Sequence, residues 1–193
     1  MFKYYKRALA RSQKFSKNEE GATAVEFALV ALPFFALIFA IIELAIIFFI
    51  GSALNNATSE AGRLVRVGQF QDCGGAETFK EHVCENMRGL GNCEANLRVD
   101  VISDSLFSNI AVPDTSDVTV DPATGEFTPE VGTFTPDIGA SSPVIVQSTF
   151  YYRLALPAQL TRLESSPGSN IRILKSTTAF NTEPFPPSSA CPT

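Results

Sequence analysis

The sequence predicts an α+β protein in which a long N-terminal transmembrane, pilin-like helix precedes a small exported domain. We expect that domain to consist of one helix packed on a three- or four-stranded antiparallel sheet. The prediction depends on an apolar run over residues 27–50, a helical pattern that continues beyond it, and period-two alternation in the C-terminal half. A chain of 193 residues is long enough for one modest domain and such an appendage.

The apolar run from Phe27 to Ile50 is the predicted transmembrane part of the helix. As a helix it would measure roughly 36 Å, at about 1.5 Å per residue, and a hydrocarbon core is about 30 Å thick. Cleaved secretory signals have apolar regions of only about 7–15 residues, so we expect a retained span.

The charge is distributed unevenly around this run. Residues 1–20 hold six Lys or Arg and two Glu, a charge of +4, which leaves −9 for the rest of a chain whose net charge is −5. Because basic residues flank the cytoplasmic end of a span, the head should be cytoplasmic and the body outside. No cluster of Lys or Arg with aromatic residues occurs in the body, so we expect no nucleic-acid partner.

The helical pattern continues past the membrane, so one helix should cover residues 22–67. Pro33 lies inside it and removes one backbone donor. A face of small residues at Ala53, Ala57, Ala61 and Gly62 would allow a close approach by another element. That face could lie on the protein's own domain or on another subunit, and the sequence does not choose between them.

Residues 68–193 form the predicted exported, periplasmic domain. An apolar stripe at helical spacing predicts a second helix over residues 76–90. Alternation with β-branched and aromatic enrichment predicts strands over residues 96–103, 144–156 and 171–180, with a short edge strand over 118–120. In the first strand we expect Arg98 and Asp100 to lie opposite the apolar face, and we expect the carboxylates of the body to be solvated.

Two segments of the domain should be irregular: the loop over residues 104–142 and the proline-rich tail over 184–193. The loop contains a tandem repeat, GEFTPEV over 125–131 followed by GTFTPDI over 132–138. Two short copies do not make a solenoid, so we interpret them as a duplicated turn in a weakly ordered surface loop.

Four cysteines lie in the exported part, where an oxidising compartment favours disulfides. Cys93 follows a flexible turn after the second helix and can return to Cys84 more easily than Cys73 can reach it. We therefore favour Cys84–Cys93 and, by elimination, Cys73–Cys191, although four cysteines permit three connectivities.

Residues suited to catalysis are scarce. With His82 as the one histidine, and without a Gly-rich phosphate loop, no nucleophile–base arrangement or zinc site can be argued. We expect a protein that is not an enzyme and that has no cofactor, metal or small-molecule substrate.

Glu26 is a carboxylate at the mouth of the apolar helix, where an unpaired charge is unfavourable. A cut after Gly21 would create an amine on Ala22, one helical turn away. That amine could meet Glu26 of the same chain or of a neighbouring subunit. The alternative is that Glu26 lies in the headgroup zone at little cost.

The stretch GATAVEFALVALPFFALIFAIIELAIIFF resembles the N-terminal segment of TadE-like proteins, minor pilins (pseudopilins) of the Tad/Flp type IVb tight-adherence pilus. Its Gly21, Glu26 and Phe27 match the class III signal of that family. Pro33 and the membrane carboxylate Glu43 match the usual TadE-like pattern. The major Flp pilins have tyrosine at the Phe27 position, which favours a minor component.

The resemblance implies a mechanism. A prepilin peptidase would cut between Gly21 and Ala22, and the mature helix would wait in the bacterial inner membrane. It would then join an initiation or tip complex with other minor pilins and pilus assembly platform proteins, and so reach the pilus or cell surface. Glu26 would pair with the new amine, whereas Glu43 should face another helix or a basic partner residue.

Two alternatives remain open at this point. The chain could be an unprocessed bitopic inner-membrane protein whose periplasmic domain binds a partner. It could also be a pseudopilin of a secretion system.

Overall fold

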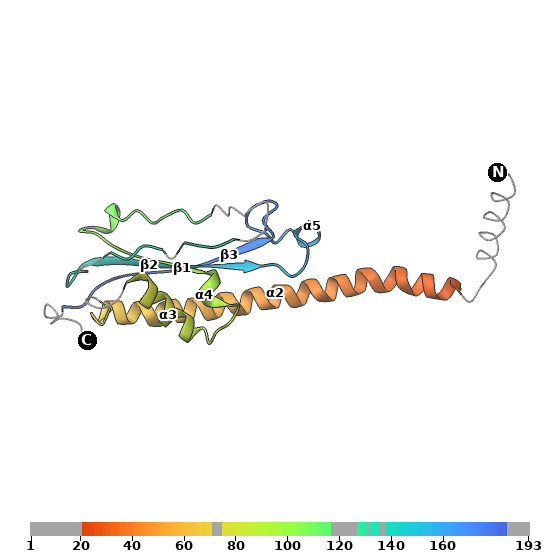
Figure 1. Cartoon of the computed structure of the whole chain (residues 1–193), viewed down its shortest axis with the longest axis horizontal. Coiled ribbons are helices and arrows are strands. Elements are labelled where there is room, and N and C mark those ends of the chain that lie inside the picture. The colour runs from red at the N-terminus through yellow and green to blue at the C-terminus, as the bar shows by residue number, and fades with distance from the viewer. Residues whose placement is uncertain (1–20, 71–74, 117–126, 131, 136–137, 185–193) are drawn as a thin grey trace. The chain divides into compact units, whose positions relative to one another are not determined.

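A computed structural model of the chain describes residues 21–70, 75–116, 127–130, 132–135 and 138–184 (Figure 1). The chain divides into two compact units, Met1–Ile42 and Glu43–Thr193. The second unit contains the whole sheet and the hydrophobic core. The predicted α+β class is thereby confirmed.

Helix α2 comprises Ala22–Arg66, with Pro33 inside it. Arg63 and Arg66 lie in its last turn, where cations interact favourably with the helix dipole. Within the described residues, it is the one helix long and apolar enough to cross a membrane.

Three antiparallel strands form the sheet: β1 (Leu97–Ser103), β2 (Pro143–Arg153) and β3 (Ile171–Asn181), in the order β1-β2-β3. Leu97 lies opposite Phe150, and Arg153 lies opposite Ile171. The short elements are α3 (Ala76–Asn86), α4 (Cys93–Asn96), η2 (Phe107–Asn109) and α5 (Ala158–Thr161). The edge strand expected over residues 118–120 falls outside the described residues.

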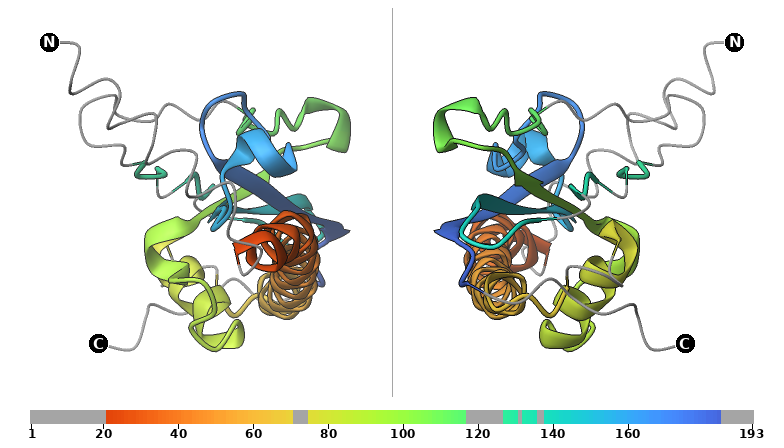
Figure 2. Two further views of the ribbon diagram at one scale, coloured as in Figure 1. Left: turned by 90° about the vertical axis from the view of Figure 1, so that its right-hand side faces the viewer. Right: turned by 90° about the vertical axis from the view of Figure 1, so that its left-hand side faces the viewer.

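One face of the sheet packs against α3 and the part of α2 that belongs to the second unit, as Figure 2 shows in a view along the long helix. Strand β2 contributes Val144, Val146 and Phe150 to this layer, all fully buried. Helix α3 contributes Phe79 and Val83 to the same core. The packing gives the amphipathic stripe of each helix a covered surface, as a two-layer domain requires.

Buried positions on α2 follow a stripe with a spacing of three or four residues, which we call the α2 stripe: Glu43, Ile47, Ile50, Leu54, Ala57, Ala61 and Val65. The small residues of this face therefore lie on the protein's own domain. At Gly62, an added Cβ would lie 3.0 Å from Thr178 Cγ2, so the close approach needs a glycine or a small shift of the Thr178 side chain.

Two ends of the predicted helices and strands differ from the sequence prediction by more than one residue. Helix α3 ends at Asn86 rather than Leu90, because Arg88 and Gly89 have φ angles of 54° and 69°, outside the helical region. Strand β2 ends at Arg153 rather than Leu156, because the next amides leave the ladder for other acceptors.

The tandem repeat lies along the edge of β1 in its described residues, and these are not the weakly ordered surface turn that we expected. Thr133 and Thr135 exchange backbone hydrogen bonds with Val101 at the edge of β1. Phe134 packs near Phe79, with ring centroids 6.5 Å apart, and Phe127 packs on Tyr151 at 4.6 Å. The described residues of the repeat thus extend the sheet and cover it.

Candidate functional site

The predicted processing site lies at the start of α2. Gly21 is exposed and stands directly before Ala22, the first residue of the helix. Glu26 and Phe27 are exposed on the first turns. Within the described part of the chain, Glu26 has no hydrogen bond or ion pair, so its carboxylate is available to a partner. Ala22 precedes Glu26 by four residues, which is about one helical turn.

Large apolar side chains are exposed along the whole helical part of the first unit: Val25, Phe27, Leu29, Val30, Leu32, Phe34, Phe35, Leu37, Phe39, Ile41 and Ile42. Water would be a poor solvent for such a surface, because each buried apolar side chain gains about 1.5–3 kcal/mol. A helix that is apolar all round is typical of a membrane span or of the interior of an assembly.

Glu43 begins the second unit, and its side chain is only 3% exposed. Its Oε1 accepts hydrogen bonds from the backbone N–H groups of Ala155 at 2.5 Å and Leu156 at 3.2 Å. Its Oε2 is buried and has no hydrogen-bond partner among the described residues. The expectation that Glu43 faces another helix or a basic side chain is therefore wrong: backbone amides of its own domain bind it.

The sequence carried a signal for this placement that our prediction did not use. Counting back from Leu54 by three or four residues along the α2 stripe leads through Ile50 and Ile47 to Glu43. The carboxylate thus belongs to the face that packs on the domain. Burial raises the pKa of the neighbouring Tyr152 phenol, and the Glu43 charge adds to that effect.

Arg98 and Asp100 form a second charged site on β1. The guanidinium of Arg98 donates from Nε to Oδ2 at 3.0 Å and from Nη2 to Oδ1 at 3.1 Å, and Nη1 reaches Glu130 at 2.7 Å. Asp100 is fully buried and also accepts the Thr133 amide at 2.9 Å. The hydrogen bond to Asp100 raises the pKa of Arg98.

The burial of Asp100 corrects the expectation that the carboxylates of the body are solvated. Arg98 and Asp100 are two residues apart, so they share one face of the strand, and opposite charges there can pair. The repeat segment then covers this face, which no pattern within β1 could reveal.

A disulfide joins Cys84 of α3 to Cys93 of α4, with a Cα–Cα distance of 5.5 Å. It is the pair that the turn after the second helix favoured. Cys73 and Cys191, the other expected pair, lie outside the described residues. Among the residues that the structure describes, no group of three or more His, Cys, Asp or Glu could hold a metal ion.

Comparison with known proteins finds a match for the segment of α2 that contains Gly21, Glu26 and Glu43. Residues 21–63 match the family model of TadE-like proteins. The TadE-like segment contains Gly21, Ala22, Glu26, Phe27, Pro33 and Glu43. It covers well under half of the chain, and the sheet lies beyond it. The resemblance inferred from the sequence is confirmed for this segment, whereas searches of curated proteins and of solved structures found no match.

Proposed function

We propose that the chain is a minor pilin or pseudopilin of a Tad/Flp-type pilus, with a role in assembly rather than in catalysis. Its precursor is held in the bacterial inner membrane by α2, with the basic head in the cytoplasm and the domain in the periplasm. A prepilin peptidase cuts between Gly21 and Ala22. The mature protein then joins other minor pilins and the assembly platform in an initiation or tip complex.

One observation carries the proposal: Gly21 is exposed immediately before the helix of the TadE-like segment begins. A peptidase needs an accessible substrate, and Gly21 is exposed directly before the first residue of α2. The cut would turn Ala22 into the N-terminus of α2 and place its amine about one turn from Glu26. Pairing would then lower the cost of a carboxylate at the membrane.

The apolar surface of the first unit supports the same proposal. Nearly all large apolar side chains from Val25 to Ile42 are substantially exposed, and Ile38 is half-buried. In the precursor, lipid covers this apolar surface. Neighbouring helices of other pilins would replace the lipid on assembly, which needs no change in the domain itself.

The test is the N-terminus of the protein isolated from membranes of cells with an active prepilin peptidase. We expect intact-mass analysis and N-terminal sequencing to find a chain that begins at Ala22. A Gly21→Leu variant, and the wild type in cells without the peptidase, should both keep residues 1–21. An uncut wild-type chain beside an active peptidase would refute the proposal and leave the bitopic alternative.

A matched pair of charge-neutral variants separates assembly from folding. Glu26→Gln should leave cleavage and the fold intact but reduce the amount of the protein found in pili. Glu43→Gln changes a carboxylate of the same helix that contacts the domain, so it should act on stability instead. If Glu26→Gln assembles as well as the wild type, the proposed pairing with the amine is wrong.

A further inference from the structure

We propose that the segment over residues 154–163, here called the β2–β3 loop, inserts into the outer interfacial layer of the membrane that α2 crosses. The protein would then contact the bilayer at two places, one spanning and one shallow. This inference rests on the proposed function only in that α2 must span the membrane with its domain outside.

The first argument is the level of the loop along α2. The amides of Ala155 and Leu156 bind Glu43. Phe48 and Phe49 follow Glu43 by about 8–9 Å along the helix axis, toward the domain, and they are 70% and 62% exposed. Two aromatic side chains this exposed belong in the bilayer or its interfacial belt. The loop therefore lies deeper than they do, by a distance close to the insertion depth of about 5–10 Å of interfacial elements.

The second argument is the surface that the loop and its neighbours offer. The loop reads LALPAQLTRL, in which Ala155 and Pro157 are exposed and Leu156 and Leu163 are half-buried. Leu44 and Ile46 are exposed on the adjoining turns of α2. Ile47 packs with Leu154 and Ala158, so the loop and this part of α2 form one apolar end of the domain.

The third argument is the hydrogen bonding of the loop backbone. Besides the two amides bound by Glu43, the Leu154 amide donates to the Asn170 carbonyl at 3.0 Å. The Ala158 amide donates to Asn170 Oδ1 at 3.0 Å, and Asn170 Nδ2 donates to the Leu154 carbonyl at 2.9 Å. Pro157 has no amide, so each N–H from 154 to 158 has a protein acceptor. A loop in water does not need this, but irregular backbone at membrane depth does.

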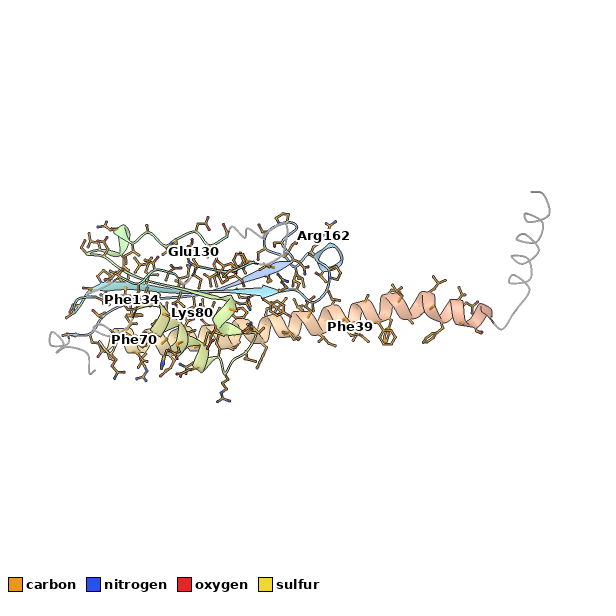
Figure 3. The ribbon with its side chains drawn as sticks, in the orientation of Figure 1. Phe39, Phe70, Lys80, Glu130, Phe134 and Arg162 are labelled. Atoms are coloured by element: carbon orange, nitrogen blue, oxygen red, sulfur yellow. A yellow bond between two sulfur atoms is a disulfide. The ribbon has the colours of Figure 1, made fainter. Side chains whose placement is uncertain are left out.

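The fourth argument is the charge at the edge of the loop. The guanidinium of Arg162 is exposed and has no hydrogen bond or ion pair among the described residues, while the Arg162 amide donates to the Ala158 carbonyl at 2.7 Å. Figure 3 shows it beside α5 at the same end of the domain. Arg172 also lies at the loop, where its Nη1 donates to the Leu163 carbonyl at 3.3 Å, and the Glu164 carboxylate that follows accepts the amides of Gly168 and Asn170. The exposed guanidinium of Arg162 suits the anionic headgroups of an interface.

The chain has no tryptophan, so single tryptophans can report on depth without interference. We would place them in the full chain at Leu156→Trp in the loop, Phe35→Trp in the spanning helix and Phe107→Trp in η2. Figure 1 shows η2 at the opposite end of the domain from α5. Each variant is reconstituted into phosphatidylcholine–phosphatidylglycerol vesicles with lipids brominated at shallow or deep acyl positions. Ala155→Trp is a second loop probe in case Leu156→Trp does not fold.

The expected result is loss of fluorescence with shallow bromines for the loop probes, loss with deep bromines for Phe35→Trp, and no loss for Phe107→Trp. Loop probes that behave like Phe107→Trp, while Phe35→Trp is quenched, would overturn the inference and leave the proposed function standing. An unquenched Phe35→Trp would mean that α2 does not span the bilayer, and both proposals would fail. If adding a partner pilin abolished the quenching of the loop probes by bromolipid, the surface would instead be assigned to a protein.

Discussion

The carboxylate of Glu43 accepts the backbone N–H of Ala155, although 112 residues separate them along the chain. The contact joins α2 to the end of β2. On the other side of α2 at this position, apolar side chains are still exposed. A membrane carboxylate that looked like a functional group for another molecule thus has a structural partner in its own domain.

Removal of this carboxylate should destabilise the domain. In Glu43→Ala the amides of Ala155 and Leu156 lose their acceptor, and a buried amide left unpaired costs about 1–3 kcal/mol. The measurement is urea unfolding of the full chain in detergent, followed by circular dichroism. Glu60→Gln is the control on the same helix, because Glu60 makes an exposed pair with Arg63. Equal midpoints for the two variants would contradict the assigned role of Glu43.

Replacement of Gly132 by alanine should detach the repeat from the sheet. A Cβ at this position would lie 1.8 Å from the Val99 carbonyl oxygen, and the φ of +110° is unfavourable for any L side chain. We expect a loss of more than about 1 kcal/mol in the free energy of unfolding. Hydrogen exchange should also become faster at Val101, whose amide binds the Thr133 carbonyl.

Gly51→Ala serves as the comparison for that variant, since nothing lies within 4 Å of its added Cβ and the position is helical. It should raise stability by about 0.5–1 kcal/mol. If Gly132→Ala were as stable as Gly51→Ala, the close approach to Val99 would be wrong.

Loss of the Cys84–Cys93 bridge should loosen the connection between α3 and α4. In the chain-entropy description, a closed loop of this size contributes about 2–3 kcal/mol. We expect the Cys84→Ala/Cys93→Ala double variant to unfold at lower urea by that amount. Peptide mapping without reduction gives an independent reading: a Cys84–Cys93 peptide is expected, and a Cys73–Cys84 peptide would contradict the pairing.

Stability should fall at alkaline pH through Tyr151. Burial raises the pKa of this phenol in the folded protein above its ordinary value of about 10. The unfolded chain therefore loses the proton first, so the stabilisation is complete below pH 10 and is lost as pH rises through the folded-state pKa. Unfolding midpoints at pH 8 and above should fall less steeply for Tyr151→Phe than for the wild type. If the unfolding midpoints of the two proteins fell equally steeply with pH, Tyr151 would not contribute to the loss of stability at alkaline pH.

Local pattern was enough to find the framework. The apolar run and the helical spacing of Leu54, Ala57 and Ala61 located α2, and alternation located all three strands, because these signals depend on neighbours in sequence. The pair Cys84–Cys93 was accessible for the same reason, since a short turn separates the two residues.

Contacts between segments that are far apart in the sequence could not be predicted from local pattern. Asp100 looked solvent-facing because alternation assigns faces but does not say what covers them, and Thr133 covers this one. The repeat looked like a free turn because its pairing partner, Val101, lies about thirty residues earlier. Glu43 was an intermediate case. The spacing of the α2 stripe could have predicted that Glu43 lies on the face that packs on the domain, but it could not have predicted that the amides of residues 155 and 156 bind the carboxylate.

The separation between Glu43 and Ala155 also sets an order in time. At about 5–20 residues per second, the chain takes about 6–22 s to extend over this separation of 112 positions. During that interval the helix has already been synthesised, while its carboxylate has neither of the amides that it binds in the finished protein. Asn170, which fixes the same loop, emerges later still. The nascent chain therefore passes through a stage in which Glu43 must remain hydrated or be held by another protein, until the last fifth of the polypeptide arrives to enclose it.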